Sequence, residues 1–318
     1  MHNRWRLPPN LHSVLAPLLH RKRLRGVSLI RSHQLDGAWA AAIASRIYAK
    51  PLVVRAGYLW AEFFEQERGP GLKARLASAL QAFTLRQAAL VIVVTEAMKH
   101  IVVHRYGTSP ESIHVIPNWV DTDLFRPRPE VEPVDGRICY VGRLHPRKNV
   151  HELLEAVMRL ARASLTIIGD GDERQRLVAF ARDHRLDVRF LGTLPHEQLP
   201  AEIAKAQIFV LPSRFEGHPK ALIEAMACGA AVVGTDVEGT RDVIRHGETG
   251  LLCPASVDGL RHAMGRLLED ADLRRRLGSA ARASVAREFS LDRIIEQELT
   301  LLAGVQRQRA TVWLPSRS

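Results

Sequence analysis

Residues 208–235, IFVLPSRFEGHPKALIEAMACGAAVVGT, decide the fold of this 318-residue chain. Residues 208–212 are a short apolar run that predicts a buried strand, and residues 231–235 are a second such run. Residues 220–228, which lie between these runs, carry apolar side chains at helical spacing. A strand, a helix and a strand in this order predict a β-α-β unit whose two strands are parallel.

The same alternation continues through the second half of the chain. Apolar runs alternate with amphipathic segments, which predicts a parallel sheet of about six strands. The expected strands are residues 138–142, 165–169, 188–192, 208–212, 231–235 and 250–253. The expected helices are residues 149–161, 173–184, 197–206 and 220–228, with a helical turn near 240–244 and helices only over 257–288 and 291–305.

The first half repeats the pattern with about four strands. The expected strands are residues 27–31, 52–55, 90–95 and 114–117, and the helices between them are residues 37–49, 72–89 and 96–106. Residues 126–136 are rich in proline and charge, which is typical of a linker. The sequence therefore predicts an α/β protein with two Rossmann-like domains, residues 1–125 and 137–290. Residues 291–318 are expected to form a helix followed by a basic tail.

Composition excludes several classes of protein. An apolar fraction of 46% and a charged fraction of 25% are ordinary for a globular domain. The three cysteines lack metal-ligand spacing and predict a reducing, cytoplasmic location. The net charge is +11, and residues 1–35 contain seven Lys or Arg and no acid. Such a segment could face nucleic acid, an anionic membrane or an anionic substrate, and solubility alone is an alternative explanation.

Two carboxylates mark the sharpest candidate site. Glu216 lies at the predicted turn between strand and helix, and Glu224 lies eight positions later inside the helix. Pro219 fits the start of a helix, whose exposed N–H groups favour phosphate. Two carboxylates so placed could contact opposite ends of one ligand. By spacing alone, a helix-start charge and a solvated glutamate remain the alternative.

Two cations mark a second candidate site. Arg143 follows the strand that ends at Gly142, and Lys148 lies near the start of the next helix. Cations at the mouth of a parallel sheet suit a diphosphate, because Arg grips two oxygens and Lys acts as a point charge. A basic surface loop is the alternative when this segment is taken by itself.

Together these segments resemble retaining glycosyltransferases of family 4, which have the GT-B fold. The resemblance runs from about residue 32 to residue 288 and has several motifs in the family's order. They are IPNWVDTDLF (116–125), VGRLHPRKN (141–149), IIGDGDER (167–174), LPSRFEGHPKALIEAMACG (211–229), TDVEGTRDVI (235–244) and HGETGLL (246–252). The resemblance implies two domains facing a cleft, and that the helix of residues 291–318 packs back on the first domain. It also implies transfer of a hexosyl group, with retained configuration, from a UDP- or GDP-linked sugar.

The resemblance also implies roles for individual residues. Glu216 matches the first glutamate of the family's motif, at the donor sugar, and Glu224 matches the second, at the ribose hydroxyls. Arg143 and Lys148 match the pair that neutralises the leaving diphosphate. The other expected donor-binding residues are Gly142, Gly217, His218, Lys220, Ala221 and Leu222, and the candidate acceptor-side residues are His33 and Arg55.

No cofactor or metal is expected. Preorganised cations and helix dipoles can stabilise the leaving diphosphate by themselves. We find no carboxylate suited to a covalent intermediate, which favours same-face attack with a phosphate oxygen as the base. The sequences Asp121-Thr122-Asp123 and Asp170-Gly171-Asp172 read as D-x-D metal motifs, but we interpret them as turns and caps.

The N-terminal region departs from the family pattern. Residues 1–25 contain no apolar strand followed by a Gly-rich loop, so we expect the N-terminal domain to be incomplete or the start to lie upstream. Arg55 stands where many members carry His in the acceptor-side loop. Ala231 replaces the usual Pro, and Trp119 replaces the usual Gly.

The acceptor is expected to be a glycan or a lipid-linked acceptor in envelope polysaccharide or lipopolysaccharide synthesis. Residues 10–31 combine an apolar helical stripe with a basic run, so they could hold the protein on the inner face of an anionic membrane. The alternatives are a degenerate, non-catalytic family member and a nucleotide-sugar epimerase of the same fold. A basic nucleic-acid-binding module is remote, because the aromatic residues form no stacking platform, so no nucleic acid is expected.

Overall fold

The computed structural model describes residues 9–312, which divide into two compact units. One unit contains the residues up to Pro117 together with those from Ile295 onward, and the other is Asn118–Ile294. Each unit is built around a parallel sheet, one with four strands and one with six. The α/β class and the two unequal sheets expected from the sequence are therefore confirmed.

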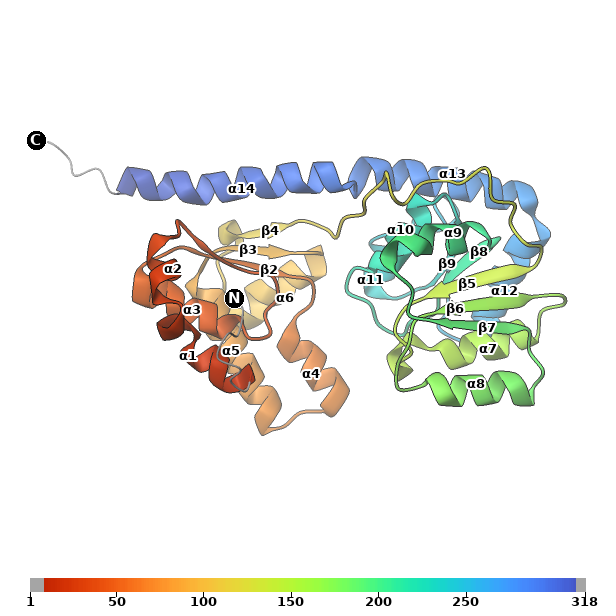
Figure 1. Cartoon of the computed structure of the whole chain (residues 1–318), viewed down its shortest axis with the longest axis horizontal. Helices are drawn as coiled ribbons and strands as arrows, with labels where there is room; N and C mark the ends of the chain where they lie inside the picture. Colours follow the sequence, from red (N-terminus) through yellow and green to blue (C-terminus); the bar gives the residue numbers. More distant parts are fainter. Residues whose placement is uncertain (1–8, 313–318) are drawn as a thin grey trace, which may run out of the picture. The chain divides into compact units, whose positions relative to one another are not determined.

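The sheet of the first unit has the order β1-β2-β3-β4 (Figure 1). Its strands are β1 (Ile30–Ser32), β2 (Leu52–Ala56), β3 (Ala88–Val93) and β4 (Ile113–Val115). Its helices are α1 (Pro9–Leu19), α2 (Arg21–Gly26), α3 (Ala38–Tyr48), α4 (Trp60–Arg68), α5 (Leu72–Gln87), α6 (Glu96–Tyr106) and the 3-10 turn η1 (Pro110–Ser112). All neighbouring strands run parallel, and their apolar side chains form one core with the flanking helices.

Two details of the first unit differ from the sequence prediction. The strand expected at residues 27–31 begins only at Ile30, because helix α2 runs to Gly26 and Val27, already extended, is partly exposed. Helix α4 was not predicted at all. Its apolar residues, Trp60, Ala61, Phe63 and Phe64, all lie in its first half and residues 65–68 are polar, so the helical spacing does not extend beyond the first turns.

The sheet of the second unit has the order β10-β9-β8-β5-β6-β7, again all parallel. Its strands are β5 (Arg137–Val141), β6 (Ser164–Ile168), β7 (Val188–Gly192), β8 (Ile208–Leu211), β9 (Ala231–Thr235) and β10 (Leu251–Cys253). Its helices are α7 (Val150–Met158), α8 (Arg174–Asp183), α9 (Leu199–Ala204), α10 (Lys220–Ala227), α11 (Glu238–Arg241), α12 (Val257–Glu269) and α13 (Ala271–Glu288), with 3-10 turns η2 (Pro146–Lys148) and η3 (His196–Gln198).

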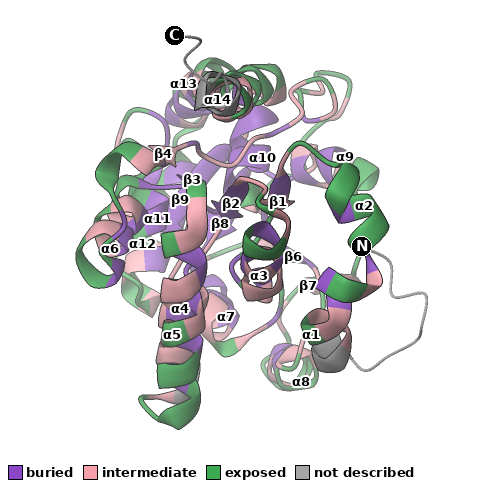
Figure 2. Ribbon diagram, turned by 90° about the vertical axis from the view of Figure 1, so that its left-hand side faces the viewer, coloured by how far each residue is buried: buried purple, intermediate pink, exposed green. Residues whose placement is uncertain are grey.

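Alternating side chains of each strand serve the two faces of this sheet. Phe209 and Leu211 of β8 join α9, α10 and the second half of α13 in one core, whereas Ile208 and Val210 join α7, α8 and α12 in the other. Since both faces are covered, the inner strands are largely apolar, which is why their sequence pattern was clear, whereas the end strand β7 has no buried residue. Figure 2 shows α10 as one of the most deeply buried helices.

The last helix, α14 (Leu291–Val312), crosses from the second unit into the first. Within the first unit, Glu298 of this helix pairs with Arg31 and with Arg55. Arg55 also donates to the carbonyl of Pro117, at 3.1 Å. Helix α14 is thereby tied to β1, to β2 and to the end of the segment that follows β4. None of the helices in the described part of the chain is long and apolar enough to span a membrane.

Candidate functional site

The carboxylate of Glu216 is held at the N-terminal end of α10. The chain leaves β8, forms a loop over residues 212–219 and enters α10 at Lys220. Glu216 Oε1 accepts a hydrogen bond from Ser213 Oγ at 2.6 Å and from Lys148 Nζ at 2.6 Å. Both side chains of the ion pair are largely buried, with 17% of Lys148 and 9% of Glu216 exposed. Because water screens buried charges poorly, Lys148 and Glu216 interact with each other, and with a charged ligand nearby, more strongly than an ion pair on the surface would.

Lys148 reaches Glu216 because their strands are neighbours. Lys148 ends η2, which follows β5, and Glu216 follows β8, which pairs directly with β5. The carboxyl ends of the two parallel strands therefore bring both loops to one edge of the sheet. Arg143 also follows β5, but its guanidinium is mostly exposed and lies 3.5 Å from Asp172. Of the two cations predicted for the diphosphate, only Lys148 contacts a predicted site residue.

The second carboxylate, Glu224, is buried one turn into α10. Only 4% of the residue is exposed. His196 Nε2 lies 2.8 Å from Glu224 Oε1, and Lys220 Nζ lies 3.9 Å from the same oxygen. Burial raises the pKa of the Glu224 carboxyl above its usual value, while the hydrogen bond and charge of His196 and the charge of Lys220 oppose that rise.

The residues around the start of α10 form a connected group. Asn118 donates from its backbone to His218 Nδ1 at 3.3 Å and from its side chain to the His218 carbonyl at 2.8 Å. The His218 ring packs edge-on against Phe289, at 5.3 Å between centroids. Lys220 Nζ lies 4.2 Å from the centre of the Trp119 ring, a cation–π contact. The first-turn N–H groups of Lys220, Ala221 and Leu222 lack partners within the helix.

Several residues that contact the predicted site residues were not themselves predicted, among them His196, Trp119 and Gly239. His196 contacts Glu224 although 28 positions separate them, and Trp119 lies against Lys220. Gly239 of α11 supports the Glu216 loop, since a Cβ there would lie 2.1 Å from the Gly217 carbonyl oxygen. The departure of Trp119 from the family pattern was a signal that could have located it. Gly239 lies within the segment TDVEGTRDVI (235–244) that carries the resemblance, although nothing in that segment indicates its contact with the Glu216 loop. The contact of His196 with Glu224 is long-range and has no local signature.

Gly142 ends β5 in a tight space. A Cβ on Gly142 would lie 2.7 Å from the Tyr140 hydroxyl, which donates to the Arg143 carbonyl at 3.0 Å. A larger residue would disturb the turn that leads toward Lys148.

The candidate acceptor-side residues lie in the first unit. His33 is exposed in the turn after β1. Arg55 is 8% exposed and is engaged by Glu298 and the Pro117 carbonyl. In this structure its guanidinium therefore joins α14, through Glu298, to Pro117, which follows β4.

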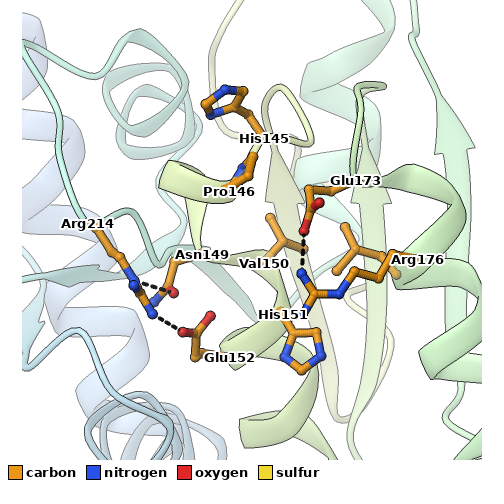
Figure 3. A pocket seen from close by; sticks show the side chains of 10 residues that line it. His145, Pro146, Asn149, Val150, His151, Glu152, Glu173, Arg176 and Arg214 are labelled. Atoms are coloured by element: carbon orange, nitrogen blue, oxygen red, sulfur yellow. Dashed lines mark hydrogen bonds and ion pairs between the residues drawn. The ribbon is translucent and has the colours of Figure 1, made fainter. Parts of the chain in front are cut away.

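A polar cavity of about 210 Å³ lies beside the η2 turn. Figure 3 shows Arg214, bonded to Asn149 and Glu152, on one side and Arg176, bonded to Glu173, on the other. None of the predicted donor-site residues lines it. The Arg214 and Arg176 guanidiniums are already paired within the cavity walls, although Arg214 belongs to the same loop as Glu216.

Acidic turns account for the two D-x-D sequences. Asp121 Oδ1 accepts from the backbone N–H groups of Asp123 and Leu124, both at 3.0 Å. Asp170 Oδ1 accepts from Gly171 N–H at 2.7 Å. Within the side chains that the structure describes, no group of three or more His, Cys, Asp or Glu is placed to hold a metal ion. That metal is not required stays a prediction.

Comparison with known families matches both parts of the chain. The family described as glycosyl transferases group 1 matches residues 121–284, more than half of the chain. The family described as Glycosyltransferase Family 4 matches residues 1–124.

Individual relatives agree with these matches. Glycogen synthase of Mycobacterium tuberculosis is 31% identical over 229 residues, which cover 69% of this chain and 55% of that protein. Alpha-D-kanosaminyltransferase of Streptomyces kanamyceticus is 31% identical over 325 residues, covering 93% of this chain and 82% of that protein. The chain thus matches only about half the length of the glycogen synthase.

Solved structures share the fold. HepE of Anabaena, crystallised in complex with UDP, has a TM-score of 0.80 at 24% identity over 93% of this chain and 84% of that chain. Sucrose-phosphate synthase of Thermosynechococcus elongatus has a TM-score of 0.82 at 24% identity over 94% of this chain and 80% of that chain. By its family matches and its fold, this chain belongs to the glycosyl transferases group 1 and Glycosyltransferase Family 4 group of GT-B proteins.

Proposed function

We propose that the protein is a retaining glycosyltransferase that moves a sugar from a nucleoside diphosphate sugar to a hydroxyl group. One arrangement carries the proposal: the loop that enters α10 carries Glu216, paired with Lys148, and the buried Glu224 lies one turn into the same helix. A helix N-terminus favours phosphate, and the two carboxylates can accept hydrogen bonds from sugar hydroxyls.

In this proposal the donor lies across the start of α10. Glu224 accepts from the ribose hydroxyls, as the family resemblance implies. The N–H groups of Lys220, Ala221 and Leu222, with Lys148 and Arg143, face the diphosphate. Glu216, Gly217 and His218 then lie next to the transferred sugar, and Gly142 leaves room for the Arg143 loop.

The reaction transfers one proton and breaks one bond. The acceptor oxygen bonds to C1 of the sugar, the bond from C1 to the β-phosphate oxygen breaks, and that phosphate takes the acceptor's proton. The products are a glycoside of retained configuration and a nucleoside diphosphate. Because negative charge grows on the diphosphate, cations fixed beforehand lower the barrier, and we propose that no metal is needed.

The ligand bound to one structural relative supports a nucleotide-sugar donor. HepE has been crystallised with UDP-glucose, and it shares this fold at a TM-score of 0.78. We propose a UDP- or GDP-linked hexose as the donor for this chain, and a glycan or lipid-linked envelope acceptor.

A panel of nucleotide sugars tests the proposal. We expect one donor to raise Tm and to release its nucleoside diphosphate when an acceptor is present. Glu224→Ala should abolish the thermal shift for that donor, because the ribose loses its acceptor. Free nucleoside diphosphate, rather than an epimerised sugar, separates transfer from epimerisation. A folded protein that binds and turns over none of the panel would contradict the proposal.

We also propose that the start of the first unit binds an anionic membrane surface. On α1, Val14 is 57% exposed and Leu18 is 63% exposed, one helical turn apart. On α2, Arg21, Lys22, Arg23 and Arg25 are all exposed, while Leu24 is buried and fixes the orientation of the helix. Apolar and basic side chains on adjacent short helices suit the headgroup region of an acidic bilayer, at about 1 kcal/mol per cation near the surface.

Vesicle sedimentation at low salt tests the membrane proposal. We expect binding to vesicles with anionic lipid, little binding to neutral vesicles, and loss of binding when the four α2 cations become Gln. A variant with the same loss of charge in the second unit should still bind. Its substitutions replace the exposed residues Arg182, Arg185, Arg189 and Arg275 by Gln. Equal loss in both variants would show a general charge effect and no α2 site.

A further inference from the structure

We propose that His196 is a positioning residue for nucleotide binding: it fixes one oxygen of Glu224 so that the other faces the ribose. The inference rests on the proposed function, since it requires a nucleoside diphosphate at the start of α10. It adds a residue that the motifs did not indicate, from a turn that follows the far strand of the sheet, β7.

Both contacts of the Glu224 carboxylate are made to the same oxygen atom, Oε1. His196 Nε2 lies 2.8 Å from Oε1, and Lys220 Nζ lies 3.9 Å from the same atom. Among residues 12–65 and 69–307, whose side chains the structure describes, no hydrogen bond or ion pair reaches Oε2. An ionised carboxylate can only accept, so Nε2 of His196 carries the proton in this contact. Oε2 is therefore the atom available to a ribose diol.

The imidazole is itself fixed in place. Its ring packs on Phe125, at 4.9 Å between centroids, and Phe125 is fully buried. Backbone rigidity comes from Pro195, which precedes the η3 turn. Nearly half of the His196 side chain, 47%, remains exposed, whereas Glu224 is 5% exposed. The histidine thus lies at the rim, between solvent and the buried carboxylate, where an edge of the nucleotide would pass.

A buried carboxylate without such a donor would rotate or take up a proton, and either change weakens its hydrogen bonds to a diol. Lys220 cannot replace His196, because at 3.9 Å its ammonium makes an ion pair rather than a hydrogen bond, and it is shared with the Trp119 ring.

The test compares ribose with deoxyribose ligands. We would titrate the full chain with the nucleoside diphosphate of the donor found in the panel, and with its 2′,3′-dideoxy form, by calorimetry. His196→Phe keeps the packing on Phe125 and removes the donor, whereas His196→Gln keeps a side-chain N–H. We expect His196→Phe to weaken the ribonucleotide about tenfold and to leave the dideoxy form within about twofold, with His196→Gln in between.

Steady-state kinetics should agree, with KM for the donor raised more than kcat is lowered. Equal weakening of both ligands in His196→Phe would show a merely structural role and overturn the inference, as would no weakening of either. If the wild type binds no nucleoside diphosphate, the proposed function and this inference both fail. If the wild type prefers the ribonucleotide and His196→Phe keeps that preference, only the inference fails.

Discussion

Lys148→Ala is expected to lower kcat by about 10²–10³-fold, the usual cost of removing one preorganised group that stabilises developing charge. The Lys148 ammonium is largely buried, so its charge is poorly screened by water, and in the proposed reaction it faces the leaving diphosphate. The measurement is kcat for sugar transfer at a saturating donor concentration, determined from the rate at which nucleoside diphosphate is released.

Lys148 also holds Glu216, so the two roles must be separated. If Lys148 only held the carboxylate in place, Glu216→Gln would cost as much as Lys148→Ala, and the double variant would cost no more than either one. We expect the double variant to be slower than Glu216→Gln alone. Lys205→Ala is a matched control, because Lys205 also forms a 2.6 Å ion pair in the second unit, with Glu202. It should leave kcat unchanged.

The fold was predictable because most strands are buried on both faces. All five residues of β9 are buried, as are all four of β8, so their apolar runs located both strands to within a residue. Where an element is only partly buried, the apolar pattern of the sequence did not locate its ends. The apolar run at residues 27–31 includes Val27, which caps the end of α2 instead of starting β1. Apolar character alone does not distinguish these two positions.

The site was predictable only where topology brings neighbouring loops together. Lys148 and Glu216 follow adjacent strands, so a β-α-β pattern was sufficient to place them at one edge. His196 follows β7, at the end of the sheet, and meets Glu224 of α10, which follows β8, so the strand order alone does not bring them together. Arg143 shows the reverse case. Its position after β5 was expected, but an exposed side chain takes a direction that sequence spacing does not determine.

Gly239→Ala is expected to weaken donor binding by at least about tenfold, although Gly239 is not among the predicted site residues. The new Cβ would lie 2.1 Å from the Gly217 carbonyl oxygen and 2.6 Å from that of Glu216. Both atoms belong to the backbone, so no side chain can rotate to relieve the clash, and the loop that carries Glu216 must move. Displacements of this size at a binding loop cost orders of magnitude in rate.

The measurement is the dissociation constant for the donor's nucleoside diphosphate, together with Tm. A matched control is Gly265→Ala, in helix α12 of the same unit, where a Cβ would make an ordinary 3.5 Å contact with Leu160. That substitution should leave binding unchanged and raise stability by up to about 1 kcal/mol, since Ala favours a helix over Gly. If Gly239→Ala bound the nucleotide as tightly as Gly265→Ala does, the Glu216 loop would not depend on α11 for its position. The ligand contacts proposed for that loop would then need another support.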